Sequence, residues 1–154
     1  MLELNQSVLD YIENSNAELF ALLKELAQIP APSGNEDLRV EFVKKWFENV
    51  GAKNVIVDSA KNVIVPINCE NCNDITVFMA HTDVVFPDLT TLPYTEDDEY
   101  VYCPGIGDDT ACLANLMMVA KYVIQNNLTA KKGVMFIANS CEEGLGDLKG
   151  SKQI

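Results

Sequence analysis

The sequence predicts an α/β fold in which a mixed, mostly parallel sheet is flanked by helices. Segments with apolar residues at helical spacing alternate with short apolar runs of strand length. Two of these runs, residues 74–80 and 134–139, are apolar almost throughout, which is typical of strands covered on both faces of a sheet. Hydrophobic residues make up 48% of the 154 residues, enough for the core of one domain.

Three helices are expected. Residues 7–28 carry a helical apolar stripe, which ends where two prolines and a glycine in residues 29–34 force a loop. Asn35 is expected to cap the second helix, and Gly51 is expected to end it. Residues 109 to about 125 form the third helix, with a regular apolar stripe.

The remaining elements are short. Residues 54–58 and 62–66 are expected to pair as strands across a tight connection. Residues 84–107 are expected to form a long polar loop with an acidic turn at residues 95–99 and a short strand at residues 100–103. Both long apolar runs end in ionisable residues, and sites of α/β sheets lie beyond the carboxyl ends of strands.

The charge balance argues against some classes of partner. The chain carries 11 basic and 23 acidic side chains, a net charge of −12, which disfavours binding to nucleic acid and to anionic membranes. The first residues lack the basic and apolar segments of a signal peptide, and no apolar run reaches the ~20 residues of a membrane helix. We therefore expect a cytoplasmic protein.

Five cysteines, an odd number in a chain that is not expected to be secreted, indicate free thiols. Cys69 and Cys72 form a C-x-x-C pair, but a structural zinc site would need a second pair. The residues around them, 70–74, indicate a turn between strands and not the helix start of a redox motif. Two incidental loop thiols are the favoured interpretation, and redox chemistry or adventitious metal binding is the alternative.

His81, the only histidine, ends the first apolar run. Asp83 lies two positions later, on the same side of an extended segment. A carboxylate there can accept the proton of one imidazole nitrogen and leave the other nitrogen free for a metal ion. A structural histidine is the competing interpretation.

Two further acidic pairs stand at element ends. Asp108 and Asp109 follow Gly105–Gly107 and open a helix, where capping alone would also explain them. Glu142 and Glu143 follow the second apolar run, where two carboxylates are costly unless they are solvated, paired or bound to a metal. A divalent cation would explain both, if one glutamate binds it and the other takes a proton from bound water.

Three segments in order resemble the M20 family of metallopeptidases and deacylases, which includes glutamate carboxypeptidases, tripeptide aminopeptidases and acetylornithine deacetylases. They are residues 80–83 (AHTD), 107–109 (GDD) and 141–144 (CEEG), and the loop of residues 29–36 is similar as well. The short interval between the first two segments favours M20 over related aminopeptidases with a domain inserted there. The resemblance implies a zinc-peptidase-like catalytic domain.

The resemblance also implies a role for each residue. His81 and Glu143 would each bind one of two zinc ions, and Asp108 would bridge both. Asp83 would orient His81, and Glu142 would be the general base. Cobalt or manganese could replace zinc.

The choice of Asp108 over Asp109 as the bridge depends on a position two residues later, where the family frequently has lysine. Here that position is Thr110, so the bridging residue stays open by one position.

The implied activity is hydrolysis of a peptide or N-acyl amide bond by an exopeptidase-type enzyme acting on a short peptide or N-acyl amino acid. Residues 1–154 are expected to be the N-terminal portion of the catalytic domain, without its C-terminal part and without the dimerisation or lid domain that would make the full-length protein a homodimer. Each metal would then have one private ligand and the bridge, so we expect this chain to be inactive by itself. The alternatives are a non-catalytic metal-binding or regulatory module and a C-x-x-C thiol redox protein.

Overall fold

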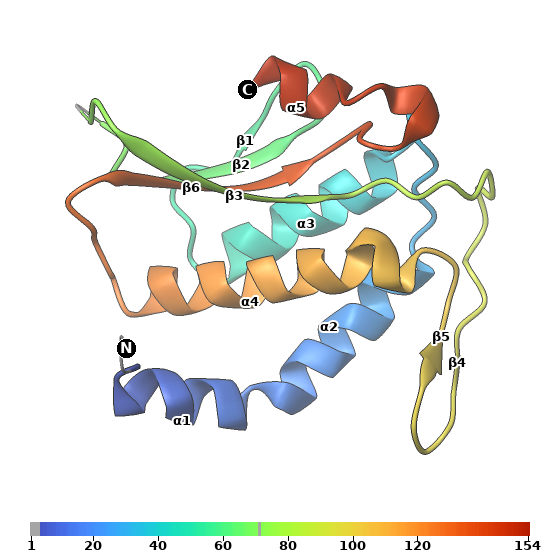
Figure 1. The fold of residues 1–154 in the computed structure, drawn as a ribbon, viewed down its shortest axis with the longest axis horizontal. Helices are drawn as coiled ribbons and strands as arrows, with labels where there is room; N and C mark the ends of the chain where they lie inside the picture. The colour runs from blue at the N-terminus through green and yellow to red at the C-terminus, as the bar shows by residue number, and fades with distance from the viewer. Residues whose placement is uncertain (1–3, 71) are drawn as a thin grey trace.

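The computed structural model describes residues 4–70 and 72–154 (Figure 1). Its centre is a four-stranded sheet with the order β1-β2-β6-β3. The β3 and β6 strands are parallel, and the other two pairings are antiparallel. The mixed sheet is confirmed, with a smaller parallel part than expected. The strands are β1 (Ile56–Val57), β2 (Val63–Ile67), β3 (Ile75–His81) and β6 (Gly133–Asn139).

Four helices lie on one face of this sheet, and the short α5 (Lys149–Gln153) lies on the other (Figure 1). A hairpin of β4 (Thr95–Glu96) and β5 (Val101–Tyr102) stands beside α2. The expected α/β class with a sheet flanked by helices is confirmed. The four helices are α1 (Gln6–Asn14), α2 (Asn16–Gln28), α3 (Asp37–Asn49) and α4 (Ala111–Gln125).

The hydrophobic core lies between these helices and the sheet. Burial contributes about 1.5–3 kcal/mol for each large aliphatic or aromatic side chain, so this face is the main source of stability. None of the helices in residues 4–70 and 72–154 is long and apolar enough to span a membrane. Core side chains without exposed surface include Leu26, Val43, Phe47, Val63, Leu113 and Met117.

Two details of the helices differ from the prediction. The single helix expected over residues 7–28 is two helices that meet at Ser15. Asn14 Nδ2 donates to the Asp10 carbonyl oxygen (2.7 Å), and such side-chain bonds compete with the helical backbone pattern. Asn35 does not cap α3, because its N–H closes a turn onto the Pro32 carbonyl and the helix starts after Glu36.

The β-rich segments agree in part. The pair of strands expected at residues 54–58 and 62–66 is confirmed as β1 and β2. The acidic segment of residues 95–99, expected as a turn, contributes β4 as well, and β4 pairs with the expected strand β5.

The prediction that both long apolar runs are buried is right for β6 and wrong for β3. Residues 75–79 of β3 are exposed, with exposed fractions of 39% for Val77 and 41% for Met79. The reason is topological: within the described residues, β3 is an edge strand with β6 as its neighbour. Its carboxyl end, at Ala80 and His81, is buried.

Candidate metal centre

The parallel pairing of β3 and β6 creates the site. Its register places His81 opposite Asn139, so the carboxyl ends of both strands lie side by side. The Thr82 N–H donates to the Asn139 carbonyl oxygen at 2.7 Å and extends the pairing by one residue. Residues 81–83 are thereby held next to residues 140–143, which are distant in sequence.

His81 is almost fully buried, with 7% of its surface exposed. Its Nδ1 lies 2.9 Å from the Asp83 carbonyl oxygen and 3.5 Å from Asp83 Oδ1, so Nδ1 carries the proton. The other ring nitrogen, Nε2, lies 3.2 Å from Asp108 Oδ1 and 3.8 Å from Glu142 Oε2. When Nε2 loses its proton, it offers the lone pair that a metal ligand needs.

The electrostatics of His81 depend on its acidic neighbours. Burial lowers the pKa of the imidazole, but the hydrogen bond and charge of Asp83, followed by Asp108 and Asp109, outweigh burial and raise it to about 9. The metal-free histidine is therefore an imidazolium near neutral pH. A metal ion has to displace this proton, so binding will depend on pH.

Asp83 is fully buried and joins the two strand ends. Its carboxylate accepts hydrogen bonds from Ser33 Oγ (2.7 Å) and from the backbone N–H groups of Glu142 (2.9 Å) and Glu143 (3.0 Å). Burial raises the pKa of Asp83, but the contact with His81 and the hydrogen bonds from Ser33 and the two N–H groups hold it at about 2. Asp83 thus stays ionised and fixes the Glu142–Glu143 turn against His81.

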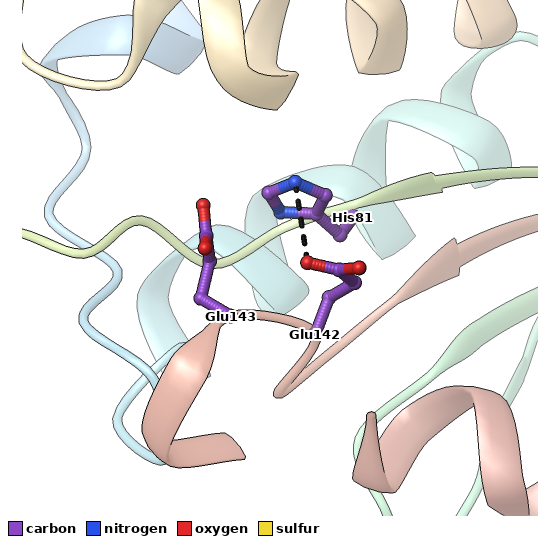
Figure 2. Close-up of side chains that lie close together, drawn as sticks. All are labelled: His81, Glu142 and Glu143. Carbon is purple, nitrogen blue, oxygen red and sulfur yellow. Dashed lines mark ion pairs between the residues drawn. The ribbon is translucent and has the colours of Figure 1, made fainter. Parts of the chain in front are cut away.

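Figure 2 shows the imidazole of His81 facing Glu142, to which the dashed ion pair runs, with the side chain of Glu143 beside them. One ligand atom from each of the three residues lies within 4.8 Å of the others. Burial raises the pKa of Glu143, and the charge of Asp108 raises it further, whereas the charge of His81 lowers it. A carboxyl that resists ionisation among other carboxylates indicates a negative potential that a cation would relieve. One nitrogen and two carboxylate groups fit zinc, cobalt or manganese.

Asp108 and Asp109 have different surroundings. They lie in the turn Ile106–Thr110 before α4, and the peptide bond between them is cis. Asp109 Oδ2 accepts the backbone N–H of His81 at 3.1 Å, whereas Asp108 Oδ1 faces the imidazole. The Asp108 side chain is 83% exposed and does not belong to the close group formed by His81, Glu142 and Glu143. Asp109 therefore braces the end of β3, and Asp108 is free to turn toward a metal.

A groove of about 390 Å³ opens beside Glu143. Its wall is mostly apolar and comes from the loops that follow α2, β3 and β6. Of His81, Glu142 and Glu143, it is Glu143 that lines this groove. The lining residues are Pro32, Ser33, Asn35, Val84, Val85, Pro87, Leu89, Glu143 and Gly144.

Sequence reasoning missed the residues that hold the site in place. Glu36, fully buried, accepts hydrogen bonds from the Cys141 N–H (3.1 Å) and Sγ (3.2 Å) and so anchors the residue before Glu142. Ser33 supports Asp83 in the same way. The sequence indicated Glu36 and Ser33 only through the resemblance of residues 29–36 to the corresponding loop of M20 enzymes. That resemblance located the segment but not its contacts.

The C-x-x-C pair lies away from this centre, between β2 and β3. All five cysteines are free. Cys69 Sγ donates to the Val134 carbonyl oxygen (3.3 Å), and Cys72 Sγ donates to that of Asn68 (3.0 Å). The expected turn of residues 70–74 includes Asn71, which lies outside the described residues.

Comparison with known families identifies the chain. Residues 62–154, more than half of it, match the model of peptidase family M28, so the chain belongs to this family. No curated protein matches its sequence.

The predicted resemblance to M20 peptidases is confirmed by comparison with solved structures. A tripeptidase from Staphylococcus aureus is 27% identical, with a TM-score of 0.64 over 88% of this chain and 40% of its own. Aminopeptidase PepT from Bacillus cereus is 23% identical (TM-score 0.68, 88% and 39%). The Bacillus subtilis YXEP protein, described as a dinuclear metal-binding peptidase of family M20, is 15% identical (TM-score 0.57, 91% and 40%). The chain thus spans about two fifths of their length.

Proposed function

We propose that this chain forms part of a metal-dependent peptidase that hydrolyses the peptide or N-acyl amide bond of a short substrate, as an exopeptidase. The observation that carries the proposal is the close group of His81, Glu142 and Glu143 at the ends of two parallel strands. Membership of a peptidase family and structural likeness to a tripeptidase and an aminopeptidase support it.

The proposal assigns His81 and Glu143 as ligands of two different metal ions and Asp108 as the bridge between them. The position of Asp108 Oδ1 beside Nε2 supports Asp108 over Asp109. The donor set favours zinc, with cobalt or manganese as substitutes. Bound metal ions would supply activation of the attacking water and polarisation of the scissile carbonyl.

Side chains of this chain would carry out the proton transfers and hold the reacting groups in place. Glu142 takes the proton of the attacking water and passes it to the nitrogen of the leaving amine. Its side chain is 35% exposed, so a substrate can reach it. Asp83 keeps the Nδ1 proton in place and holds Glu142 and Glu143 through their N–H groups. The apolar groove beside Glu143 would seat a substrate side chain.

The wider setting is also a proposal. The matched structures are more than twice as long as this chain, which supports a larger catalytic domain with further ligands and a lid or dimerisation domain. Five free thiols support a reducing, cytoplasmic location. The charge of −12 supports the absence of nucleic-acid and membrane partners.

Zinc binding tests the proposal. Equilibrium dialysis followed by elemental analysis should find zinc on the wild-type chain. The variants His81→Gln and Glu143→Gln should each lose at least one equivalent. Glu99→Gln, in the exposed β4–β5 turn, is the control and should bind as the wild type does.

Hydrolysis forms the second arm. In the full-length protein, hydrolysis of a dipeptide or N-acyl amino acid should fall by about 10²–10⁴-fold in Glu142→Gln, the range of general-base catalysis, while zinc binding persists. A full-length protein that binds no zinc, or one that hydrolyses its substrate at an unchanged rate in Glu142→Gln, would refute the proposal. Zinc binding without hydrolysis in the full-length protein would favour the non-catalytic module.

A further inference from the structure

Arg39 is the only arginine of the chain, since every other basic side chain is a lysine. It lies in the first turn of α3 and is fully buried. Burial lowers the pKa of its guanidinium to about 10, which leaves it charged at neutral pH. Arginine differs from lysine in offering a rigid, planar fork of donors. The position therefore uses the one basic side chain that can bind several acceptors at fixed angles.

The fork of Arg39 reaches three separate segments. Nη1 donates to the Thr82 carbonyl oxygen (3.0 Å) and to Thr110 Oγ1 (3.2 Å), and Nη2 donates to the Ile29 carbonyl oxygen (2.7 Å). Thr82 lies between His81 and Asp83, and Thr110 directly follows Asp109. One side chain thus joins the segment of the histidine to the segment of the two aspartates.

Stability alone does not explain this arrangement. All three acceptors are uncharged oxygens, and Nε has no hydrogen-bond partner among the described residues. A buried charge that lacks a hydrogen-bonded carboxylate is costly, and hydrophobic replacements of buried ionic groups are often neutral or stabilising. The charge is better explained by the geometry that it imposes on the two segments.

Thr110 passes this restraint on to the aspartate turn. Its Oγ1 accepts from Arg39 and donates to the Gly105 carbonyl oxygen at 2.8 Å. Both ends of the turn that contains Asp108 are therefore tied to the guanidinium. The separation of 3.2 Å between Asp108 Oδ1 and His81 Nε2 depends on the relative position of these two segments.

We propose that Arg39 is a positioning residue of the metal centre, which sets the distance between the His81 segment and the Asp108 segment through Thr82 and Thr110. The inference rests on the proposed metal-dependent function. Arg39 touches neither the metal ligands' donor atoms nor the substrate groove by any of these bonds. It acts through the backbone of Thr82 and the hydroxyl of Thr110.

The test uses zinc and the 154-residue chain. Arg39→Lys keeps the charge, but its single Nζ cannot reach acceptors that are divided between Nη1 and Nη2, so we expect zinc to bind about 10–100-fold more weakly, the usual effect of losing a group that supports a ligand. Thr110→Val removes only the hydroxyl and should weaken zinc binding about tenfold, whereas Thr110→Ser should restore it. Thr76→Val, on the exposed part of β3, is the matched control. Circular dichroism confirms which variants are folded at the assay temperature.

The single histidine provides a readout without metal. The imidazole resonances of His81 at fixed pH should shift in Thr110→Val and return in Thr110→Ser, because Asp108 moves and comes back. Equal zinc affinity and unchanged resonances in folded Thr110→Val would overturn the proposal, even if Arg39→Lys unfolds. If the wild type binds no zinc while the resonances respond as expected, the metal function fails and the positioning role stands.

Discussion

Replacing Asp83 with asparagine tests the central contact of the site. The carboxylate is fully buried and accepts three hydrogen bonds, from Ser33 Oγ and from the N–H groups of Glu142 and Glu143. An asparagine has one acceptor oxygen, so its NH₂ group must face at least one of these donors. Each buried donor left without a partner costs about 1–3 kcal/mol, and we expect a total of about 3 kcal/mol.

Thermal unfolding followed by circular dichroism measures this loss. A change of about 3 kcal/mol corresponds to a fall in Tm of about 6–12 °C for a domain of this size. The matched control is Asp97→Asn, because Asp97 also accepts two backbone N–H groups and one hydroxyl but is exposed. Its effect should be much smaller. Equal shifts in Tm for both variants would refute the argument that burial makes the Asp83 contacts costly to lose.

Three further predictions concern pH, a glycine and the sheet edge. Because the pKa of His81 is raised to about 9, zinc should bind about tenfold more weakly for each pH unit between 9 and 7, as chelator competition would measure. The metal-free chain should lose about 3 kcal/mol of stability to urea unfolding as the pH rises from 6.5 to 9, because the raised pKa stabilises only the protonated state. A flat pH profile in either assay would contradict the corresponding prediction. Gly105→Ala should cost about 1–3 kcal/mol and weaken zinc binding, because Gly105 has a φ of +70° and a Cβ there would collide with Val84; a Tm like that of the wild type contradicts this. Val77→Lys on exposed β3 should shift Tm by no more than about 2 °C, whereas Ile137→Lys on buried β6 should prevent folding; similar outcomes would mean that β3 is covered.

The sequence determined the local elements and the chemistry that the site can use. Apolar spacing located α2, α3 and α4, and short apolar runs located β2, β3 and β6. These patterns depend on neighbouring residues, so they are readable without knowing what lies across the fold. Candidate site residues could be named because ionisable groups directly after apolar runs require a reason. The exposure of β3 could not be read, because an apolar strand has the same sequence at the edge and in the middle of a sheet.

Tertiary structure alone decided which of these groups meet. The parallel register of β3 and β6 brings His81 beside Glu142 and Glu143, and no local pattern specifies a register between strands so far apart in sequence. The tertiary structure also gives Asp108 and Asp109 different contacts, the first with the imidazole of His81 and the second with its backbone N–H. It gives Arg39, which looks like an ordinary helix residue in the sequence, contacts to three segments. The physical reason is that the free energy of a charged group depends on burial and on its hydrogen-bond partners, and both are properties of the folded chain.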